Sequence, residues 1–311
     1  MKRDRPNFIA ALMLVAALSL PAHAMASSAF GGIVIFGDSL SDTGNLASAT
    51  FPFPYPYFQN RVSNGPVAVE ELATLLGLSL TTSLHLVGRP SGNNYAVAGA
   101  NALGPDLKNL QHQLAAFLDL HGGVVPSGWL YVFFIGGNDV IAAGRWSNLE
   151  QSRKHAKKAA RRVARKARRV IRAGARNLLV VKVPDIGLVP DALARDRQNP
   201  GAAAYATRIS RIFNRKLGRK VRRIEADTGI DIASFNSVKW LRGLIANASA
   251  LGFSNTRDGC WSSEHRSFHP DCQLGALFNR FVFFDEIHPT ARTHQLWGDA
   301  LHQNVSNHTW Q

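Results

Sequence analysis

The sequence is poor in cysteine, and only one stretch of it is strongly apolar. Cys260 and Cys272 are its only cysteines, so the chain can form no more than one internal disulfide. After the N-terminal region, no apolar run approaches the roughly 20 residues that a helix needs to span a bilayer, which predicts a soluble mature chain. The sequence also lacks internal repeats and low-complexity linkers, so nothing in it indicates several domains.

Acidic residues are scarce relative to basic ones. The chain has 36 Lys and Arg against 21 Asp and Glu, and 20 of the 36 basic residues fall in segments 153–176 and 208–223. Apolar or small residues recur at helical spacing in both segments, which predicts two amphipathic helices. The charges allow three interpretations: solvated helix faces, electrostatic contact with anionic membrane surfaces, and indiscriminate binding of nucleic acid. An export signal argues against the third, so no specific nucleic-acid partner is expected.

That export signal is in the first 26 residues, which have the features of a secretory signal peptide. Basic residues precede an apolar run from Phe8 to Leu20, which is short for a membrane anchor. Small residues allow cleavage after Ala24 or after Ala26. About 285 residues then remain, enough for one large α/β domain over 27–311. The mature protein is expected in the periplasm or outside the cell; an uncleaved anchor is the alternative.

The two cysteines lie close together in the sequence. In an exported protein, such a pair favours one disulfide, Cys260–Cys272, that closes a short loop. His265 and His269 lie between them, so a Cys/His zinc site is a competing interpretation. Thiolates rarely persist in an oxidising compartment and the spacing fits no familiar zinc pattern, so no metal site is expected.

Short apolar runs alternate with helical patterns along the mature chain. This alternation predicts βαβ units and a parallel sheet that helices cover on both faces. The apolar runs are 33–36, 129–135, 178–183, 230–235 and 281–284.

Polar residues follow several of these predicted strands, where α/β proteins build their sites. Ser39 follows the first strand, Asn138 the second, and Asp185 the third. A serine in such a turn is either a helix cap or a nucleophile, and the latter needs a base. Asp285-x-x-His288 provides one, because a carboxylate on imidazole Nδ1 leaves Nε2 free to take the serine proton.

Four motifs, in this order, resemble the GDSL family of lipases and esterases, also called SGNH hydrolases: Gly37-Asp38-Ser39-Leu40, Gly99, Gly136-Gly137-Asn138-Asp139 and Asp285-x-x-His288-Pro289-Thr290. Segments 61–66 and 94–96 are similar to the branch that contains secreted bacterial phospholipases, haemolysins and acyltransferases. The resemblance implies a flavodoxin-like three-layer α/β/α sandwich with a five-stranded parallel sheet.

The resemblance also implies a role for each matching residue. Ser39 matches the nucleophile, His288 the base and Asp285 the residue that orients the base. The backbone N–H groups of Ser39 and Gly99, with the side-chain amide of Asn138, match the oxyanion hole. One departure is that Ala98-Gly99-Ala100 carries a single glycine where this branch often has two. All these groups belong to the protein, so no cofactor is expected.

Other conspicuous residues have simpler interpretations. Asp38, Asp42 and Asp139 are expected to cap and bond turns rather than to transfer protons. The histidines His265, His269 and His294 are expected at the surface or in packing. The aromatic and proline-rich loop 51–58 could form the apolar wall of a substrate groove or could simply pack against the fold.

Together these features predict a secreted serine hydrolase that cleaves lipid carboxylic esters through an acyl-Ser39 intermediate. Its expected partner is a lipid or another ester substrate, with phospholipase A or lysophospholipase activity first and acyl transfer to another alcohol left open. The alternatives are an esterase for short-chain or carbohydrate esters and, from another class, a non-catalytic basic protein that binds surfaces. The sequence does not indicate an oligomeric state.

Overall fold

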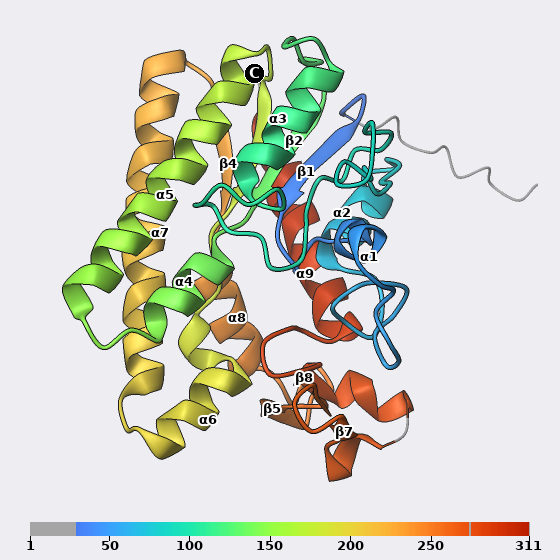
Figure 1. Cartoon of the computed structure of the whole chain (residues 1–311), viewed down its shortest axis with the longest axis vertical. Helices are drawn as coiled ribbons and strands as arrows, with labels where there is room; N and C mark the ends of the chain where they lie inside the picture. Colours follow the sequence, from blue (N-terminus) through green and yellow to red (C-terminus); the bar gives the residue numbers. More distant parts are fainter. Residues whose placement is uncertain (1–28, 274, 311) are drawn as a thin grey trace, which may run out of the picture.

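The computed structural model describes residues 29–273 and 275–310 of the chain (Figure 1). The predicted signal peptide and the domain boundary after residue 26 lie outside these residues and stay predictions.

A parallel four-stranded sheet forms the centre of the fold. Its strands lie in the order β1 (Ile33–Gly37), β2 (Leu130–Phe134), β3 (Asn177–Val181) and β4 (Ile232–Phe235). Every residue of the first three strands is buried. Their continuous apolar runs are typical of a sheet covered on both faces.

The prediction of five strands is wrong by one. The last predicted strand, β8 (Phe281–Phe283), pairs instead with β5 (Asn255–Gly259) in a separate two-stranded sheet. The edge beside β1 is occupied by the extended segment 93–97, whose Tyr95 N–H donates to Ile35 O at 2.8 Å. The Asn94 side chain accepts the N–H of Ala96 at 3.0 Å. The ladder beside β1 is interrupted at Gly37, whose N–H donates to the side chain of Gln113 at 3.0 Å rather than to this segment.

Helices cover both faces of the sheet, as predicted for a three-layer sandwich (Figure 1). Residues such as Val34 and Phe36 pack in one hydrophobic cluster and Ile33 and Ile35 in the other, because successive strand residues point to opposite faces. The first cluster contains residues of α3 (Leu110–Leu120), α4 (Gly137–Gly144), α5 (Leu149–Arg172) and α7 (Ala202–Thr228); the second contains residues of α2 (Ala68–Leu75) and α9 (Ala291–Ser306).

The remaining elements are short or lie at the edges. They are α1 (Asn45–Ala49), α6 (Pro190–Gln198), α8 (Ser237–Ala246), the hairpin of β6 (Trp261–Ser262) and β7 (Ser267–Phe268), and the 3₁₀ turns η1 (Ile186–Leu188), η2 (Pro270–Cys272) and η3 (Gly275–Arg280). None of the helices within the described ranges is both long and apolar enough to cross a membrane.

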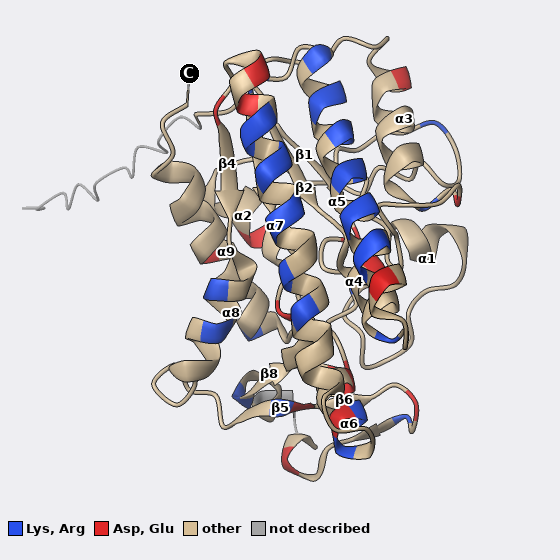
Figure 2. Ribbon diagram, turned by 90° about the vertical axis from the view of Figure 1, so that its left-hand side faces the viewer, with Lys and Arg blue, Asp and Glu red and all other residues tan. Residues whose placement is uncertain are grey.

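The two predicted basic helices are confirmed as α5 and α7, which pack side by side (Figure 2). A stripe of small and β-branched residues buries one face of α5, including Ala156, Ala160 and Val163. The side chain of Asn148 caps its first turn by accepting the N–H of Gln151. Lysines and arginines cover the outer surface of both helices.

A glycine turn joins β2 to α4 and so places Asn138 at the sheet edge. Gly136 has φ +114°, a conformation that residues with a side chain rarely adopt. A Cβ there would lie 2.4 Å from Cζ of Phe213, which belongs to α7. The turn therefore requires glycine both for its backbone and for the close approach of α7.

Gly136→Ala should lower the free energy of unfolding more than Gly201→Ala. Gly201 is also a helix N-cap with positive φ, +98°, but a Cβ there would meet nothing within 4 Å. We expect the free energy of unfolding to fall by about 1–2 kcal/mol in the control, Gly201→Ala. In Gly136→Ala it should fall by roughly a further 1–3 kcal/mol, because the new Cβ overpacks against Phe213. Urea unfolding measures both; equal losses would show that the contact with Phe213 has no cost.

Candidate active site

Ser39 lies in a tight turn directly after β1. The carbonyl of Asp38 accepts the N–H groups of Ser41 and Asp42, each at 3.0 Å. Gln113 of α3 holds the end of the strand from the other side, since its side chain accepts the N–H of Gly37 and donates to the carbonyl of the same residue. The turn thus fixes the serine at the carboxyl end of the sheet.

The structure brings Ser39 together with Asp285 and His288, although about 250 residues separate them in sequence. Nε2 of His288 lies 2.8 Å from the hydroxyl oxygen of Ser39. Its Nδ1 lies 2.9 Å from both carboxylate oxygens of Asp285. The same carboxylate accepts the N–H groups of Ile287 and His288 at 2.8 and 2.7 Å, which fixes its orientation.

The surroundings favour the charged forms of both Asp285 and His288. Burial alone would lower the pKa of His288, but the negative charge and hydrogen bond of Asp285 outweigh it and raise the pKa above its ordinary value. For Asp285, burial would raise the pKa, but His288 and the backbone N–H donors lower it. The pair is therefore an ionised carboxylate beside an imidazole of increased basicity.

The three predicted oxyanion donors come from three segments: the turn after β1, the loop around Gly99 and the start of α4. Asn138 lines the same pocket as Ser39, and its amide donates to the carbonyl of Ala100 at 2.8 Å. The Ala100 bond places Asn138 beside the Gly99 loop. Gly99 adopts φ +74°. Among the described residues, the backbone N–H groups of Ser39 and Gly99 have no hydrogen-bond partner, so both are free to donate to a substrate.

Asp42 links the serine turn to the Gly99 loop. Its buried carboxylate accepts the N–H groups of Gly44, Asn45 and Leu46 in its own turn and that of Ala98 at 2.7 Å. Burial raises its pKa and the backbone donors oppose that effect. The interpretation of Asp42 as a residue that bonds turns is confirmed.

Two further buried carboxylates also hold backbone in place, as expected. Asp38 accepts the N–H of Leu40 at 3.2 Å and Asp139 that of Ala102 at 2.7 Å. Burial raises the pKa of Asp38 to about 6 and that of Asp139 to about 7. Asp185, at the end of the third strand, is bound by Arg242 and Thr207 and does not line the pocket of Ser39.

The other histidines take no part in this group. His294 is fully buried, and its Nδ1 accepts the N–H of Ala68 at 3.1 Å. Burial, together with the charge of His288, lowers its pKa to about 3. His265 is exposed, and His269 accepts the N–H of Asp271. Packing and surface roles are therefore confirmed for these three residues.

Tyr57 is a residue of the site that sequence reasoning missed. Its hydroxyl donates to Asp285 Oδ2 at 3.2 Å, and its ring packs against Phe284. Loop 51–58 therefore packs against the fold through Tyr57, while Phe51 and Tyr55 are 83% and 79% exposed. No residue of this loop lines the pocket of Ser39. An aromatic and proline-rich loop soon after the nucleophile was the only signal.

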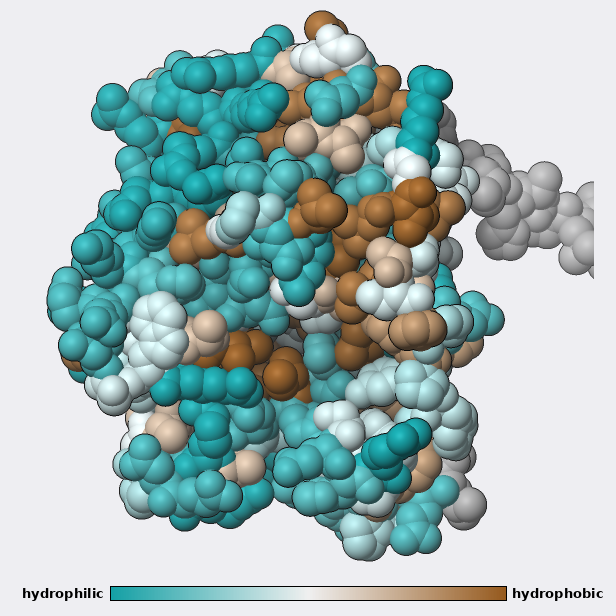
Figure 3. Space-filling model, viewed as in Figure 1, coloured by the Kyte–Doolittle hydropathy of each residue, from teal (hydrophilic) through white to brown (hydrophobic). Residues whose placement is uncertain are grey.

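The pocket at Ser39 is narrow and mostly apolar. Its volume is about 30 Å³, far below the roughly 300–1,000 Å³ that is usual for ligand sites. Only the reacting end of a substrate fits in this conformation, and the rest lies on the surface outside. Figure 3 shows hydrophobic side chains around the hollow on this face of the molecule. The apolar lining includes Leu40, Ile141, Pro184, Ile186, Val189, Leu241, Phe283, Ile287, Pro289 and Trp297.

Cys260 and Cys272 form the predicted disulfide. It lies beside β8, since the N–H of Cys260 donates to the carbonyl of Phe283. Both cysteines are buried with Phe281 and Phe284 in a small hydrophobic cluster. The disulfide removes both sulfurs as zinc ligands. Within residues 29–273 and 275–310, no group of His, Cys, Asp and Glu side chains has a metal-binding arrangement.

Comparisons of the sequence with known proteins show the family of the chain. Residues 33–301 match the family described as GDSL-like Lipase/Acylhydrolase. The chain is 31% identical over 259 residues to a phosphatidylcholine-sterol acyltransferase of Aeromonas hydrophila, covering 80% of this chain and 73% of that protein. It is 25% identical to a thermolabile hemolysin of Vibrio parahaemolyticus, covering 91% and 66%. A solved acetylxylan esterase of Geobacillus stearothermophilus is 14% identical, with a TM-score of 0.46 and coverage of 91% and 98%. The chain therefore belongs to the GDSL-like lipase/acylhydrolase family and is a carboxylic ester hydrolase.

Proposed function

We propose that this hydrolase cleaves carboxylic esters of lipids, as a phospholipase A or lysophospholipase, through an acyl-Ser39 intermediate. The observation that carries the proposal is the hydrogen-bonded series from Ser39 through His288 to Asp285, which opens into an apolar pocket. The acyl group then passes to water or to a second alcohol.

The chemistry uses only groups of the protein. Oγ of Ser39 attacks the ester carbonyl while Nε2 of His288 takes its proton, and the carbonyl electrons move to the oxygen. The N–H groups of Ser39, Gly99 and Asn138 stabilise that oxyanion. When the C–O bond breaks, His288 returns the proton to the leaving alcohol. Water or another alcohol then attacks the acyl-serine and loses its proton to His288. The bond between the acyl carbon and Oγ of Ser39 breaks, and His288 returns the proton to Oγ, which restores the free enzyme.

Four observations support a lipid substrate. The pocket lining is apolar, and Phe51 and Tyr55 present exposed aromatic side chains on the loop that also carries Tyr57. One relative is named for the transfer of an acyl group from phosphatidylcholine to a sterol, and another for haemolysis. The basic helices α5 and α7 would draw the protein to anionic membranes, where each Lys or Arg contributes about 1 kcal/mol.

Export of the mature protein is part of the same proposal. The Cys260–Cys272 disulfide supports it, because disulfides persist in oxidising compartments. An exported protein would also meet membrane lipids from outside the cytoplasm.

The second candidate is an esterase for short-chain or carbohydrate esters. The small volume of the pocket, about 30 Å³, favours it. A non-catalytic role for the basic helices alone leaves the Ser39–His288 hydrogen bond without an explanation.

Product analysis with the mature enzyme separates these candidates. We expect release of fatty acid from phosphatidylglycerol and its lyso form, and sterol ester when cholesterol is added if an alcohol accepts the acyl group. Ser39→Ala, the control, should lose at least about 10⁴-fold in turnover with an unchanged unfolding midpoint. Turnover of a short nitrophenyl ester alone would favour the second candidate, and an active Ser39→Ala protein would exclude the acyl-serine mechanism.

The pH dependence should identify His288 as the base. A base must be neutral to accept a proton, and the pKa of His288 is raised above 6.5. We therefore expect kcat/KM for a soluble ester to be low in acid and to rise with pH through an inflection above 6.5. Asp285→Asn removes the largest of the charges that raise this pKa, so the residual activity should have a lower inflection. A flat profile from about pH 5 to about pH 9 would contradict the role of His288.

Phe51 and Tyr55 should matter for vesicles but not for soluble esters. Neither side chain lines the pocket, and each can transfer exposed aromatic area into a bilayer. The pair Phe51→Ser and Tyr55→Ser should raise the apparent KM for phospholipid vesicles about tenfold and leave kcat/KM for a soluble nitrophenyl ester unchanged. Val124→Ser, which alters another side chain that is 73% exposed, is the control. Equal effects of the two changes would refute a specific membrane contact by this loop.

A further inference from the structure

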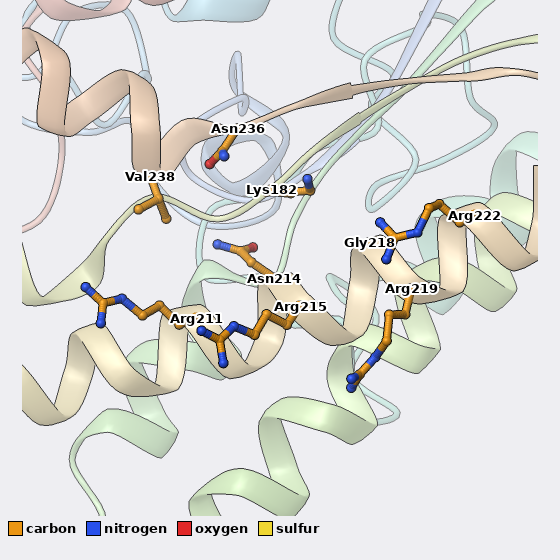
Figure 4. A pocket seen from close by; sticks show the side chains of 9 residues that line it. All are labelled: Lys182, Arg211, Asn214, Arg215, Gly218, Arg219, Arg222, Asn236 and Val238. Carbon is orange, nitrogen blue, oxygen red and sulfur yellow. The ribbon is translucent and has the colours of Figure 1, made fainter.

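A second cavity lies between α7 and the segment that follows β3 (Figure 4). Its volume is about 470 Å³, within the range of roughly 300–1,000 Å³ that is usual for ligand sites. We call it the basic groove. Its polar lining comes from three parts of the chain: Lys182 after β3, Arg211, Asn214, Arg215, Arg219 and Arg222 of α7, and Asn236 before α8.

The positive charges of the basic groove have no acidic partners. No Asp or Glu lines it, and within the described part of the chain none of its five cations forms an ion pair. Other arginines on the same helices are paired, since Arg168 and Arg223 both bind Asp227. The groove therefore concentrates charge that the protein itself does not neutralise.

Two of these charges converge above a glycine. A Cβ on Gly218 would lie 3.7 Å from Nη1 of Arg222 and 3.9 Å from Nζ of Lys182. Figure 4 shows Arg222 extending over Gly218 toward Lys182, while Arg219 points away. Glycine within a helix costs about 1 kcal/mol relative to alanine, and these contacts would be ordinary ones. Packing therefore does not require a glycine at this position. The lack of a side chain does leave open space between Lys182 and Arg222.

The environment of Lys182 disfavours its charged form. Burial, and then the charge of Arg222, lowers the pKa of Lys182. An anion between the two side chains would reverse the second effect and offset the first.

The wall of the groove is rigid and is shared with the catalytic pocket. The side chain of Asn214 binds both the N–H and the carbonyl of Val183, at 3.1 and 2.8 Å. Lys182 faces the groove, whereas Pro184, two residues later, lines the pocket of Ser39. The segment from Lys182 to Pro184 would therefore separate a ligand in the groove from the ester site.

We propose that the basic groove binds the phosphate groups of a ligand that carries at least two negative charges. Arginine guanidinium groups match phosphate oxygens in pairs, and the Lys182 ammonium adds a point charge. The phosphates belong either to a lipid headgroup with a phosphomonoester or to a free oligophosphate. The site is separate from ester hydrolysis, and its test does not depend on turnover.

Calorimetric titration of the full chain with inorganic pyrophosphate tests the proposal. We expect one equivalent to bind, and the variant with Lys182→Met and Arg222→Gln to bind at least tenfold more weakly. The matched control combines Lys166→Met and Arg169→Gln on α5. It removes the same charge, and the pKa of Lys166 is likewise lowered by burial and by Arg169, but α5 alone forms that surface. The affinity of the control variant for pyrophosphate should fall less than twofold.

Either of two results would overturn the proposal. Equal weakening of both double variants would assign binding to the overall charge of α5 and α7. Absence of pyrophosphate binding, together with equal vesicle binding by both double variants, would leave the groove without a phosphate ligand. Thermal unfolding of each variant checks that the fold is intact.

A third variant tests the floor of the groove without removing charge. Gly218→Ala keeps all five cations and should raise the unfolding midpoint, because alanine favours a helix. Its Cβ would occupy the space between Lys182 and Arg222, so pyrophosphate affinity should fall at least threefold. Unchanged affinity would place the ligand elsewhere and refute the site.

Vesicles identify the source of the phosphate. Phosphatidylcholine vesicles containing phosphatidic acid carry phosphomonoesters, while those containing phosphatidylglycerol carry only phosphodiesters. Preference of the wild type for phosphatidic acid, lost in the Lys182/Arg222 variant but kept in the α5 control, would support a lipid headgroup. Pyrophosphate binding without that preference would support a soluble oligophosphate.

Discussion

The buried carboxylate of Asp42 is the contact on which the arrangement of the site depends. It accepts three N–H groups from its own turn and one from Ala98. A buried carboxylate is tolerated where hydrogen bonds satisfy it, so separation of the serine turn from the Gly99 loop would cost the carboxylate the donor from Ala98, one of its four. One side chain with no part in the chemistry thus holds the nucleophile and an oxyanion donor together.

The general base needs a different support, because it lies outside the main sheet. His288 follows β8, which pairs with β5 in the small second sheet. The loop from 57 to 64 connects the two parts: Tyr57 donates to Asp285, Ser63 donates to the carbonyl of Pro289, and Asn64 accepts the N–H of Ala291. Three such bonds, spread along one loop, position the base beside Ser39.

The sequence was sufficient for the catalytic group and for most of the fold. Ser39, Asp285 and His288 could be found because short motifs carry them, and the parallel sheet because its strands are continuously apolar. The last apolar run gave no indication that it would leave the main sheet, since apolar runs do not encode their pairing partner. Contacts such as Tyr57 with Asp285, 228 residues apart, depend on tertiary structure. No local pattern reports them.

The basic helices also show that local sequence patterns do not report tertiary contacts. Helical spacing was enough to predict that α5 and α7 bury one face and expose their charges, but it treats every exposed arginine alike. The groove exists because Lys182 comes from the sheet and Gly218 leaves a gap beneath Arg222. The segment from Lys182 to Val189 then separates two chemically opposite cavities, a cationic one and an apolar one. A lipid with a phosphomonoester headgroup carries a group for each cavity, a phosphate and acyl chains, whereas a free oligophosphate carries a group for the cationic cavity alone.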